Sequence, residues 1–204
     1  GYIKDSSVIG CSVKSMEFTE GTAVGGVVGS TNGESKIIDC DSAANLTNEK
    51  ISYVGGIVGQ NNGSLRVINC FNSGNITGDY AVGGIVGLER GSGISLQNCF
   101  NKGSLPENGY ALLGNPGSVA SISNCYYQEG QHGYPDANVA ATDVVGVSDD
   151  GALVSPITID GQTYTGVTAA LNAWLIAPNQ NDAQRRWQAD ALAPSGQTVY
   201  VVQF

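Results

Sequence analysis

Three glycine-rich blocks are the first candidates for chemistry in this sequence. VGGVVG begins at Val24, and VGGIVG begins at Val54 and again at Val82. A glycine-rich loop can hold a phosphate, but a dinucleotide fingerprint occurs once, between a strand and a helix. Here the block recurs, and no helical pattern follows any copy. We therefore predict that residues 54–59 bind no nucleotide, and that the block glycines shape a repeated backbone: Gly25, Gly26, Gly29, Gly55, Gly56, Gly59, Gly83, Gly84 and Gly87.

Five cysteines recur in phase with these blocks. Successive cysteines are 29, 30, 29 and 26 residues apart, at Cys11, Cys40, Cys70, Cys99 and Cys125. A zinc site needs paired ligands such as C-x2-C or nearby histidines. The sequence has no C-x-x-C and one histidine, His132, which lies in a turn-like segment and is expected to be exposed. We predict no metal and no cofactor, and a ladder of reduced, inward-facing cysteines that behave as small hydrophobes.

Aromatic residues follow three of the cysteines, at Phe71, Phe100 and Tyr126. They are the candidate ligand-binding residues, because a row of exposed rings could stack on sugars. The alternative is a ladder packed in the core, which is the more common fate of aromatic side chains.

The residues before the cysteines offer little for acid–base catalysis. Glycoside hydrolysis normally needs two positioned carboxylates. These positions hold one acid, in the series Gly10, Asp39, Asn69, Asn98 and Asn124. Asp149 and Asp150 are adjacent in the sequence and are predicted to form a turn. We assign no catalytic residue.

The elements that carry these residues repeat with a period near 30. Short strand-like runs joined by glycine- and asparagine-rich turns favour an all-β parallel solenoid, here of about four to five coils over residues 1–130. Coils would stack about 4.8 Å apart, so equivalent residues would form ladders. No single coil could bury its aliphatic residues alone.

The repeat GGIVGQNNGSLRVINCFNSGNITG resembles the GLUG motif of bacterial surface and secreted proteins. The resemblance covers roughly residues 8–130. It implies a location outside the bacterial cell or on its surface, and the motif itself contains no catalytic residue. The fourth copy, YALLGNPG, lacks the glycine pair, which suggests a last coil adapted to join something else.

Residues 131–204 differ in composition and are predicted to form a small α+β cap with one short helix. Strands with turns at SDDG and IDGQ precede the helix, for which Thr168 is the expected N-cap and Pro178 lies just past the end. The helix formers are Ala169, Leu171, Ala173, Trp174 and Leu175. The segments RRWQAD and TVYVVQF are expected to pair as strands. The LNAW segment, Trp187 and Phe204 also resemble the end of GLUG arrays.

The net charge and the hydropathy of the chain argue against some classes of partner. The 204 residues include nine Lys and Arg against eighteen Asp and Glu, for a net charge of −9. This balance argues against nucleic acid, which needs clustered basic residues. No apolar run approaches the roughly 18 residues of a membrane span, so we expect no membrane insertion. No leader segment is visible. The missing glycine block before Cys11 leads us to expect further coils before residue 1, in a monomeric module of a longer chain.

Two functions fit these observations. The first is a non-catalytic scaffold or adhesin-like module that binds glycans or proteins of a host or microbial surface. The second is a β-helix enzyme acting on polysaccharide, a lyase or glycosidase, with acids from residues 131–204. Two carboxylates about 5–10 Å apart in an aromatic-lined groove would favour the enzyme.

Overall fold

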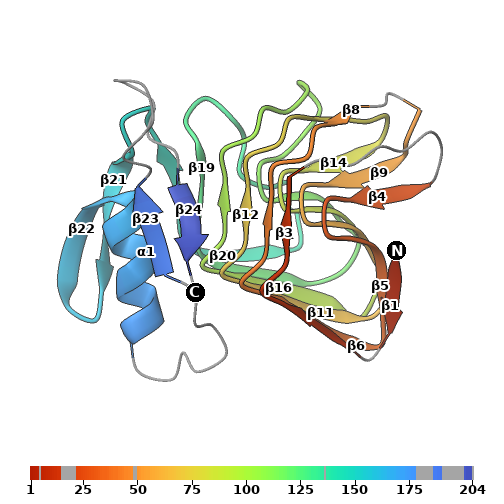
Figure 1. Cartoon of the computed structure of the whole chain (residues 1–204), viewed down its shortest axis with the longest axis horizontal. Helices are drawn as coiled ribbons and strands as arrows, with labels where there is room; N and C mark the ends of the chain where they lie inside the picture. Colours follow the sequence, from red (N-terminus) through yellow and green to blue (C-terminus); the bar gives the residue numbers. More distant parts are fainter. Residues whose placement is uncertain are drawn as a thin grey trace.

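The computed structural model describes residues 1–4, 6–14, 22–47, 50–135, 137–177, 186–189 and 200–203. The chain winds into a parallel β-solenoid of about four turns. A C-terminal unit containing a short helix lies against one side of it (Figure 1). The predicted all-β solenoid fold is confirmed.

Parallel strands from successive coils stack into columns. One sheet has the order β1 (Tyr2–Lys4), β5 (Val28–Asn32), β10 (Val58–Asn61), β15 (Val86–Glu89) and β18 (Leu113–Pro116). Smaller sheets join β4 (Ala23–Gly25), β9 (Tyr53–Gly55) and β14 (Ala81–Gly83), and join β8 (Leu46–Thr47) to β13 (Ile76–Thr77).

The largest sheet holds two columns that meet on one long strand. The first column contains β2 (Ser7–Ile9), β6 (Glu34–Ile38), β11 (Ser64–Ile68) and β16 (Gly93–Gln97). The second contains β3 (Ser12–Val13), β7 (Asp41–Ser42), β12 (Phe71–Asn72) and β17 (Phe100–Asn101). Both columns pair with β19 (Ala120–Gln128), which passes through the corner that separates them in earlier coils.

The register of the strands explains the period of the sequence. Val58 pairs with Val28 on one side and Val86 on the other, so equivalent residues of three coils lie in one row. The coil encloses two separate cores. One lies around Ile57, Val67 and the cysteines, and the other contains Val54, Leu46 and Ile76. Each core is shared between coils, as the repeat predicts.

The parallel stacking continues beyond the boundary predicted at residue 131. β20 (Val139–Val147) pairs in parallel with β19 from Ala120↔Val139 to Gln128↔Val147. Asp143 takes a left-handed φ of 54°, as Asn124 does with 49°. The segment TDVV therefore adds a partial coil that repeats the corner of SNCY without its cysteine, which is why the sequence pattern missed it.

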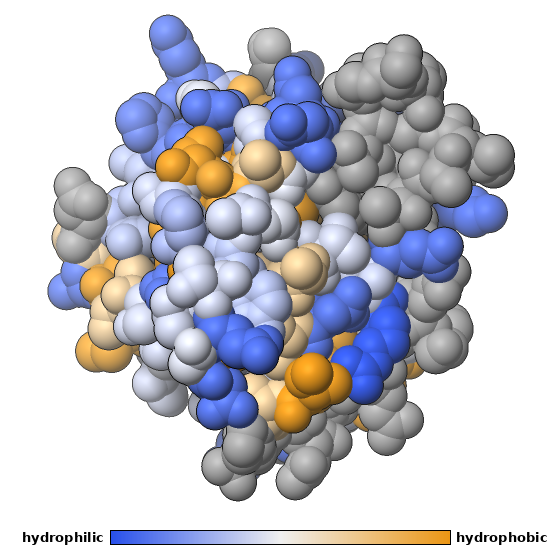
Figure 2. All heavy atoms as spheres, turned by 90° about the vertical axis from the view of Figure 1, so that its left-hand side faces the viewer, coloured by the Kyte–Doolittle hydropathy of each residue, from blue (hydrophilic) through white to orange (hydrophobic). Residues whose placement is uncertain are grey.

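The cap prediction was right about the elements and incomplete about their position. β20 and the segment around Gly133 cover the last coil, where Leu112 N–H donates to the Gly133 carbonyl at 2.8 Å. The rest packs along the side of the solenoid. It comprises β21 (Ala152–Ile159), β22 (Gln162–Gly166), α1 (Val167–Ile176), β23 (Arg186–Ala189) and β24 (Tyr200–Gln203). In the described part of this side of the molecule, hydrophilic and intermediate residues surround small separate hydrophobic patches (Figure 2).

The helix begins at Val167, two residues before the start that an N-cap at Thr168 implies. Gly166 is the N-cap, and Thr168 lies within the first turn with its Oγ1 buried and without a hydrogen-bond partner among the described residues. The prediction of Thr168 as N-cap was therefore wrong, because the extended conformation ends at Gly166 rather than two residues later. The predicted pairing of the last two segments is confirmed by antiparallel β23 and β24. Pro178 and Phe204 lie outside the described residues.

Within the described ranges, the structure contains no helix whose length and apolar character would let it cross a bilayer.

Candidate functional site

The glycine blocks lie where backbones meet directly. A Cβ added to Gly56 would lie 2.1 Å from the Gly84 carbonyl oxygen and 2.4 Å from Cγ of Asn72. A Cβ on Gly55 would lie 1.9 Å from the Val58 carbonyl oxygen. Backbone of the same and the next coil, together with a buried amide, already occupies the space that a phosphate would need. These glycines permit a tight corner of the coil.

The cysteines stack inside the coil as an inward-facing ladder. None of the five, each of which lies within the described part of the chain, forms a disulfide; Cys11 is half-buried and the other four are fully buried. The thiol of Cys70 donates to the Ile68 carbonyl at 3.2 Å. Burial raises the pKa of the Cys70 and Cys125 thiols, so both stay protonated at neutral pH. Slow thiol labelling in the native protein is the expected consequence.

The residue before each cysteine turns the corner of the coil. Asp39, Asn69, Asn98 and Asn124 have φ values of 49–54°, in the left-handed region that asparagine and aspartate tolerate. Their side chains are buried and form a chain of hydrogen bonds. Nδ2 of Asn98 donates to Oδ1 of Asn69 at 2.8 Å, and Nδ2 of Asn124 donates to Oδ1 of Asn98 at 2.7 Å. Sequence reasoning found these positions but not their shared backbone conformation.

The three predicted ligand-binding aromatics are not a surface platform. Phe71 is 4% exposed, and Phe100 and Tyr126 are fully buried. The rings of Phe71 and Phe100 stack with centroids 5.5 Å apart, and Trp187 lies edge-on to Phe71 at 5.7 Å. Of the two alternatives, the structure shows the packed ladder rather than the exposed row, because the C-terminal unit covers these rings. Asp41 takes the same ladder position in an earlier coil.

The described acidic residues include one buried carboxylate and an adjacent pair in a turn. Glu89 is fully buried, where it accepts hydrogen bonds from the amide of Asn61 and from the Ser118 hydroxyl, the latter at 2.8 Å. Asp149 and Asp150 lie in the predicted turn between β20 and β21. Within the described ranges, no group of three or more His, Cys, Asp or Glu could hold a metal ion. His132 is exposed, as predicted, with its ring 6.4 Å from that of Tyr110.

An exposed surface of tyrosines and amides is the first candidate site; we call it the tyrosine face. Tyr80 is 62% exposed, and its ring meets that of half-buried Tyr53 edge to face at 6.3 Å. Nδ2 of Asn115, on β18, donates to the Tyr80 hydroxyl at 3.2 Å. In the ladder that contains Asn115, Gln60 lies two strands away and donates to Oδ1 of exposed Asn62 at 2.6 Å.

The tyrosine face was missed because its members are not in register. Tyr53 pairs with Ala81, and Tyr80 lies one residue before that alanine. A search for repeated positions therefore passes over both. The detectable signal was a tyrosine one or two residues before two successive glycine blocks, in SYVGG and DYAVGG.

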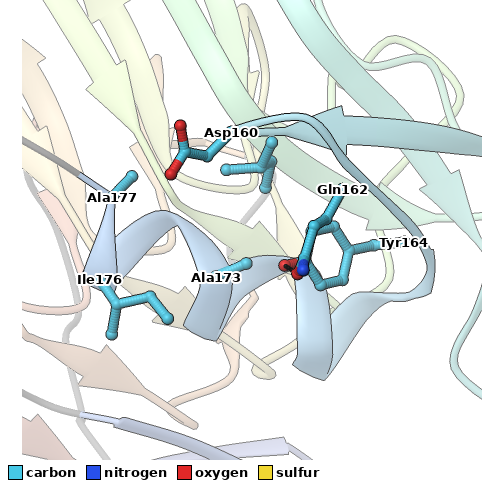
Figure 3. Close-up of a pocket in the computed structure, with 7 residues that line it drawn as sticks. Asp160, Gln162, Tyr164, Ala173, Ile176 and Ala177 are labelled. Atoms are coloured by element: carbon cyan, nitrogen blue, oxygen red, sulfur yellow. Dashed lines mark hydrogen bonds between the residues drawn. The ribbon is translucent and has the colours of Figure 1, made fainter.

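A small pocket in the C-terminal unit is the second candidate site. It has a volume of about 220 Å³ and lies between the β21–β22 hairpin and the last turn of α1. Asp160 and Ala177 lie toward one end, and Gln162 and Tyr164 lie at the other, with Ala173 between them (Figure 3). No motif in the sequence indicated this pocket.

The chain matches no protein-family model, no curated protein sequence and no solved structure. The resemblance to GLUG repeats therefore rests on the sequence motif alone.

Proposed function

We propose that this chain is a non-catalytic, adhesin-like module of a bacterial surface or secreted protein, and that it recognises glycans through the tyrosine face. The observation that carries the proposal is the ring of Tyr80, exposed beside a second tyrosine and hydrogen-bonded to Asn115. The resemblance of the repeats to the GLUG motif supports the surface location.

The chemistry of the tyrosine face suits sugars. A pyranose ring has an apolar face of C–H groups that can lie on an aromatic ring, and hydroxyls that bond to amides. Tyrosine supplies apolar area together with a polar hydroxyl, and few side-chain torsions have to be fixed on binding. Gln60 and Asn115 carry amide groups along the same sheet, and Asn62 adds a third just after the end of β10.

The solenoid gives this surface a rigid support. In-register strands fix the spacing of the coils, and buried amide ladders hold the corners. A preformed site loses little conformational entropy when a ligand binds. The same rigidity suits a scaffold that spaces other domains.

The test compares two equally exposed tyrosines on a glycan array. Tyr80→Ala removes the central ring of the tyrosine face. Tyr2→Ala is the matched control, because Tyr2 is 59% exposed and lies four strands from Asn115 in the same sheet. We expect Tyr80→Ala to weaken the best glycan hit at least tenfold, about 1.4 kcal/mol, and the control to bind like the wild type.

Two results would contradict this proposal. The first is equal binding by wild type and Tyr80→Ala, and the second is equal loss in both variants. Release of new reducing ends or unsaturated products from a hit polysaccharide would instead favour the enzymatic alternative.

A further inference from the structure

The pocket beside α1 combines features that favour a positively charged ligand. Its lining comes from the hairpin residues Ile159, Asp160, Gln162 and Tyr164 and from the helix end at Ala173, Ile176 and Ala177. The volume of about 220 Å³ is below the 300–1,000 Å³ that is typical of sites for drug-sized ligands. A side chain or a small amine fits this scale better than an oligosaccharide.

Two sources of negative potential meet at one end of the pocket. Asp160 is exposed, in the turn between β21 and β22, and among the described residues its carboxylate makes no hydrogen bond or ion pair. The last turn of α1 ends here too. The Ala177 N–H donates to the carbonyls of Ala173 and Trp174, which leaves the final carbonyls of the helix without an intrahelical partner.

The helix end adds to the charge of Asp160. A helix C-terminus carries a partial negative charge, which a basic residue in the last turn often offsets. α1 has no basic residue in its last turn. Asp160 and the end of the helix therefore attract a cation to the same place (Figure 3).

The other walls suit the carbon stem of an amine. Ile176 is 69% exposed and Ala173 lies in the centre of the lining, so both offer apolar surface. The ring of Tyr164 can attract a cation, and its hydroxyl is held by a 3.0 Å hydrogen bond to Oε1 of Gln162. A bare metal ion fits less well, because calcium takes six to eight oxygen ligands and the lining contains one carboxylate.

We propose that this pocket binds an ammonium group on a short aliphatic stem, as found in lysine side chains and in free alkylamines. Asp160 and the C-terminal end of α1 hold the ammonium group, while Ala173 and Ile176 contact the methylenes. The site lies away from the tyrosine face, on a different part of the chain, and stands or fails independently of the proposed function.

The first experiment is a titration followed by two-dimensional amide NMR of the full chain. The probes are n-butylammonium, the uncharged n-butanol, and acetyl-Gly-Lys-Gly-amide. We expect n-butylammonium to shift amides in residues 159–164 and 173–177 with an affinity at least tenfold above that of n-butanol. Added salt should weaken the charged probe and leave n-butanol unchanged.

The second experiment removes the negative charge of the Asp160 side chain by substitution. Asp160→Asn keeps the size of the side chain and suits the left-handed φ of 50° at this position. It should weaken n-butylammonium at least fivefold with a folded spectrum. Asp79→Asn is the matched control, an exposed aspartate beside exposed Tyr80 that lies outside any helix end, and should bind as the wild type does.

Each outcome of these two experiments either supports or contradicts the proposal. Tighter binding of the lysine peptide than of the amine supports a protein partner as the source of the ammonium group, and equal binding supports a free amine. Equal binding of n-butanol, unchanged affinity in Asp160→Asn, shifts confined to other residues, or no shifts up to saturating amine would each overturn the proposal.

Discussion

Single side chains close the corners of this solenoid by bonding to their equivalents in neighbouring coils. Thr31 donates to Oδ1 of Asn61 at 2.8 Å, and Nδ2 of Asn72 donates to Oδ1 of Asn101 at 2.8 Å in another corner. A primary amide suits this role because it both donates and accepts, so one residue can bond to the coil above and the coil below. Buried polar groups cost stability unless they are paired, and here each ladder pairs its own members.

Glu89 replaces an amide in one such ladder and makes it sensitive to pH. It pairs with Asn61 across the sheet, and burial raises the pKa of its carboxyl above the usual value of 4.5, although hydrogen bonds from Asn61 and Ser118 oppose the rise. A carboxyl with a raised pKa binds its proton more tightly in the folded state. Its contribution to stability is therefore greatest below pH 4.5 and is lost as the pH rises through the raised pKa.

Replacing this carboxyl should remove that pH dependence. For Glu89→Gln, the free energy of unfolding relative to wild type should increase steadily between about pH 4 and 7. Urea denaturation at several pH values measures the difference. Glu107→Gln, at an exposed position, should give a difference that does not vary in this way. A pH-independent difference for Glu89→Gln would show that the buried carboxyl does not titrate as described.

At the scale of elements, the close approach of strands defines the coil. β4, β9 and β14 each precede a glycine corner, and the next strand folds back with the two backbones in contact. Any side chain at Gly56 would meet the backbone of the next coil. This explains why the block is so regular in the sequence, and why its glycines are a signal of the fold rather than of phosphate binding.

A methyl group at this corner should be costly. Gly56→Ala places Cβ 2.1 Å from a backbone oxygen that cannot move without shifting a whole coil. We expect a loss of stability above about 3 kcal/mol, or failure to fold. Gly166→Ala is the control, since a Cβ there meets nothing within 4 Å, and should cost below about 1 kcal/mol. Thermal unfolding followed by circular dichroism distinguishes the two, and similar midpoints would contradict the tight-corner account.

The repeat made the solenoid predictable. The residues of the candidate sites do not repeat, so their positions could not be predicted in the same way. In-phase copies show which residues share a ladder, so the buried cysteines followed from spacing alone. Phe100 could not be placed in the same way. The sequence around Phe100 would be the same whether its side chain were exposed or covered. Trp187, which helps to cover it, lies 87 residues further along the chain. The pocket at Asp160 arises where a hairpin meets a helix, a contact that no local pattern encodes.

At the scale of the whole molecule, the C-terminal unit is hydrogen-bonded to more than one coil of the solenoid. Nε1 of Trp187 donates to Oδ1 of Asn69 at 2.5 Å, and Nδ2 of Asn98 donates to the Leu171 carbonyl at 3.2 Å. Both bonds reach the left-handed corners of the solenoid. The aromatic ladder appears in the coils that this unit covers, and Ser12 and Asp41 hold the position in the two coils before them.

Loss of the packing between the C-terminal unit and the solenoid should expose the aromatic ladder without unfolding the coils. Trp187→Ala should undock the C-terminal unit, with a cost of about 3–5 kcal/mol for loss of a buried tryptophan. Trp187→Phe keeps much of the ring and loses the indole N–H, with a cost of about 0.5–1.5 kcal/mol. Hydrogen–deuterium exchange should rise in α1 and around Phe71 and Phe100 but not in β5, β10 or β15. An equal increase in the exchange rate in all strands would show that the solenoid and the C-terminal unit unfold together.

The register between coils also determines how such a molecule could change its length during evolution. Because each coil meets its neighbours through the same positions, duplicating a whole segment of 28–30 residues would preserve each contact. Each copy would raise the height of the stack by about 4.8 Å. Inserting one residue within a strand would instead shift the ladders on both sides of it. The height of the solenoid could thus change in steps of one coil, with little change in local chemistry.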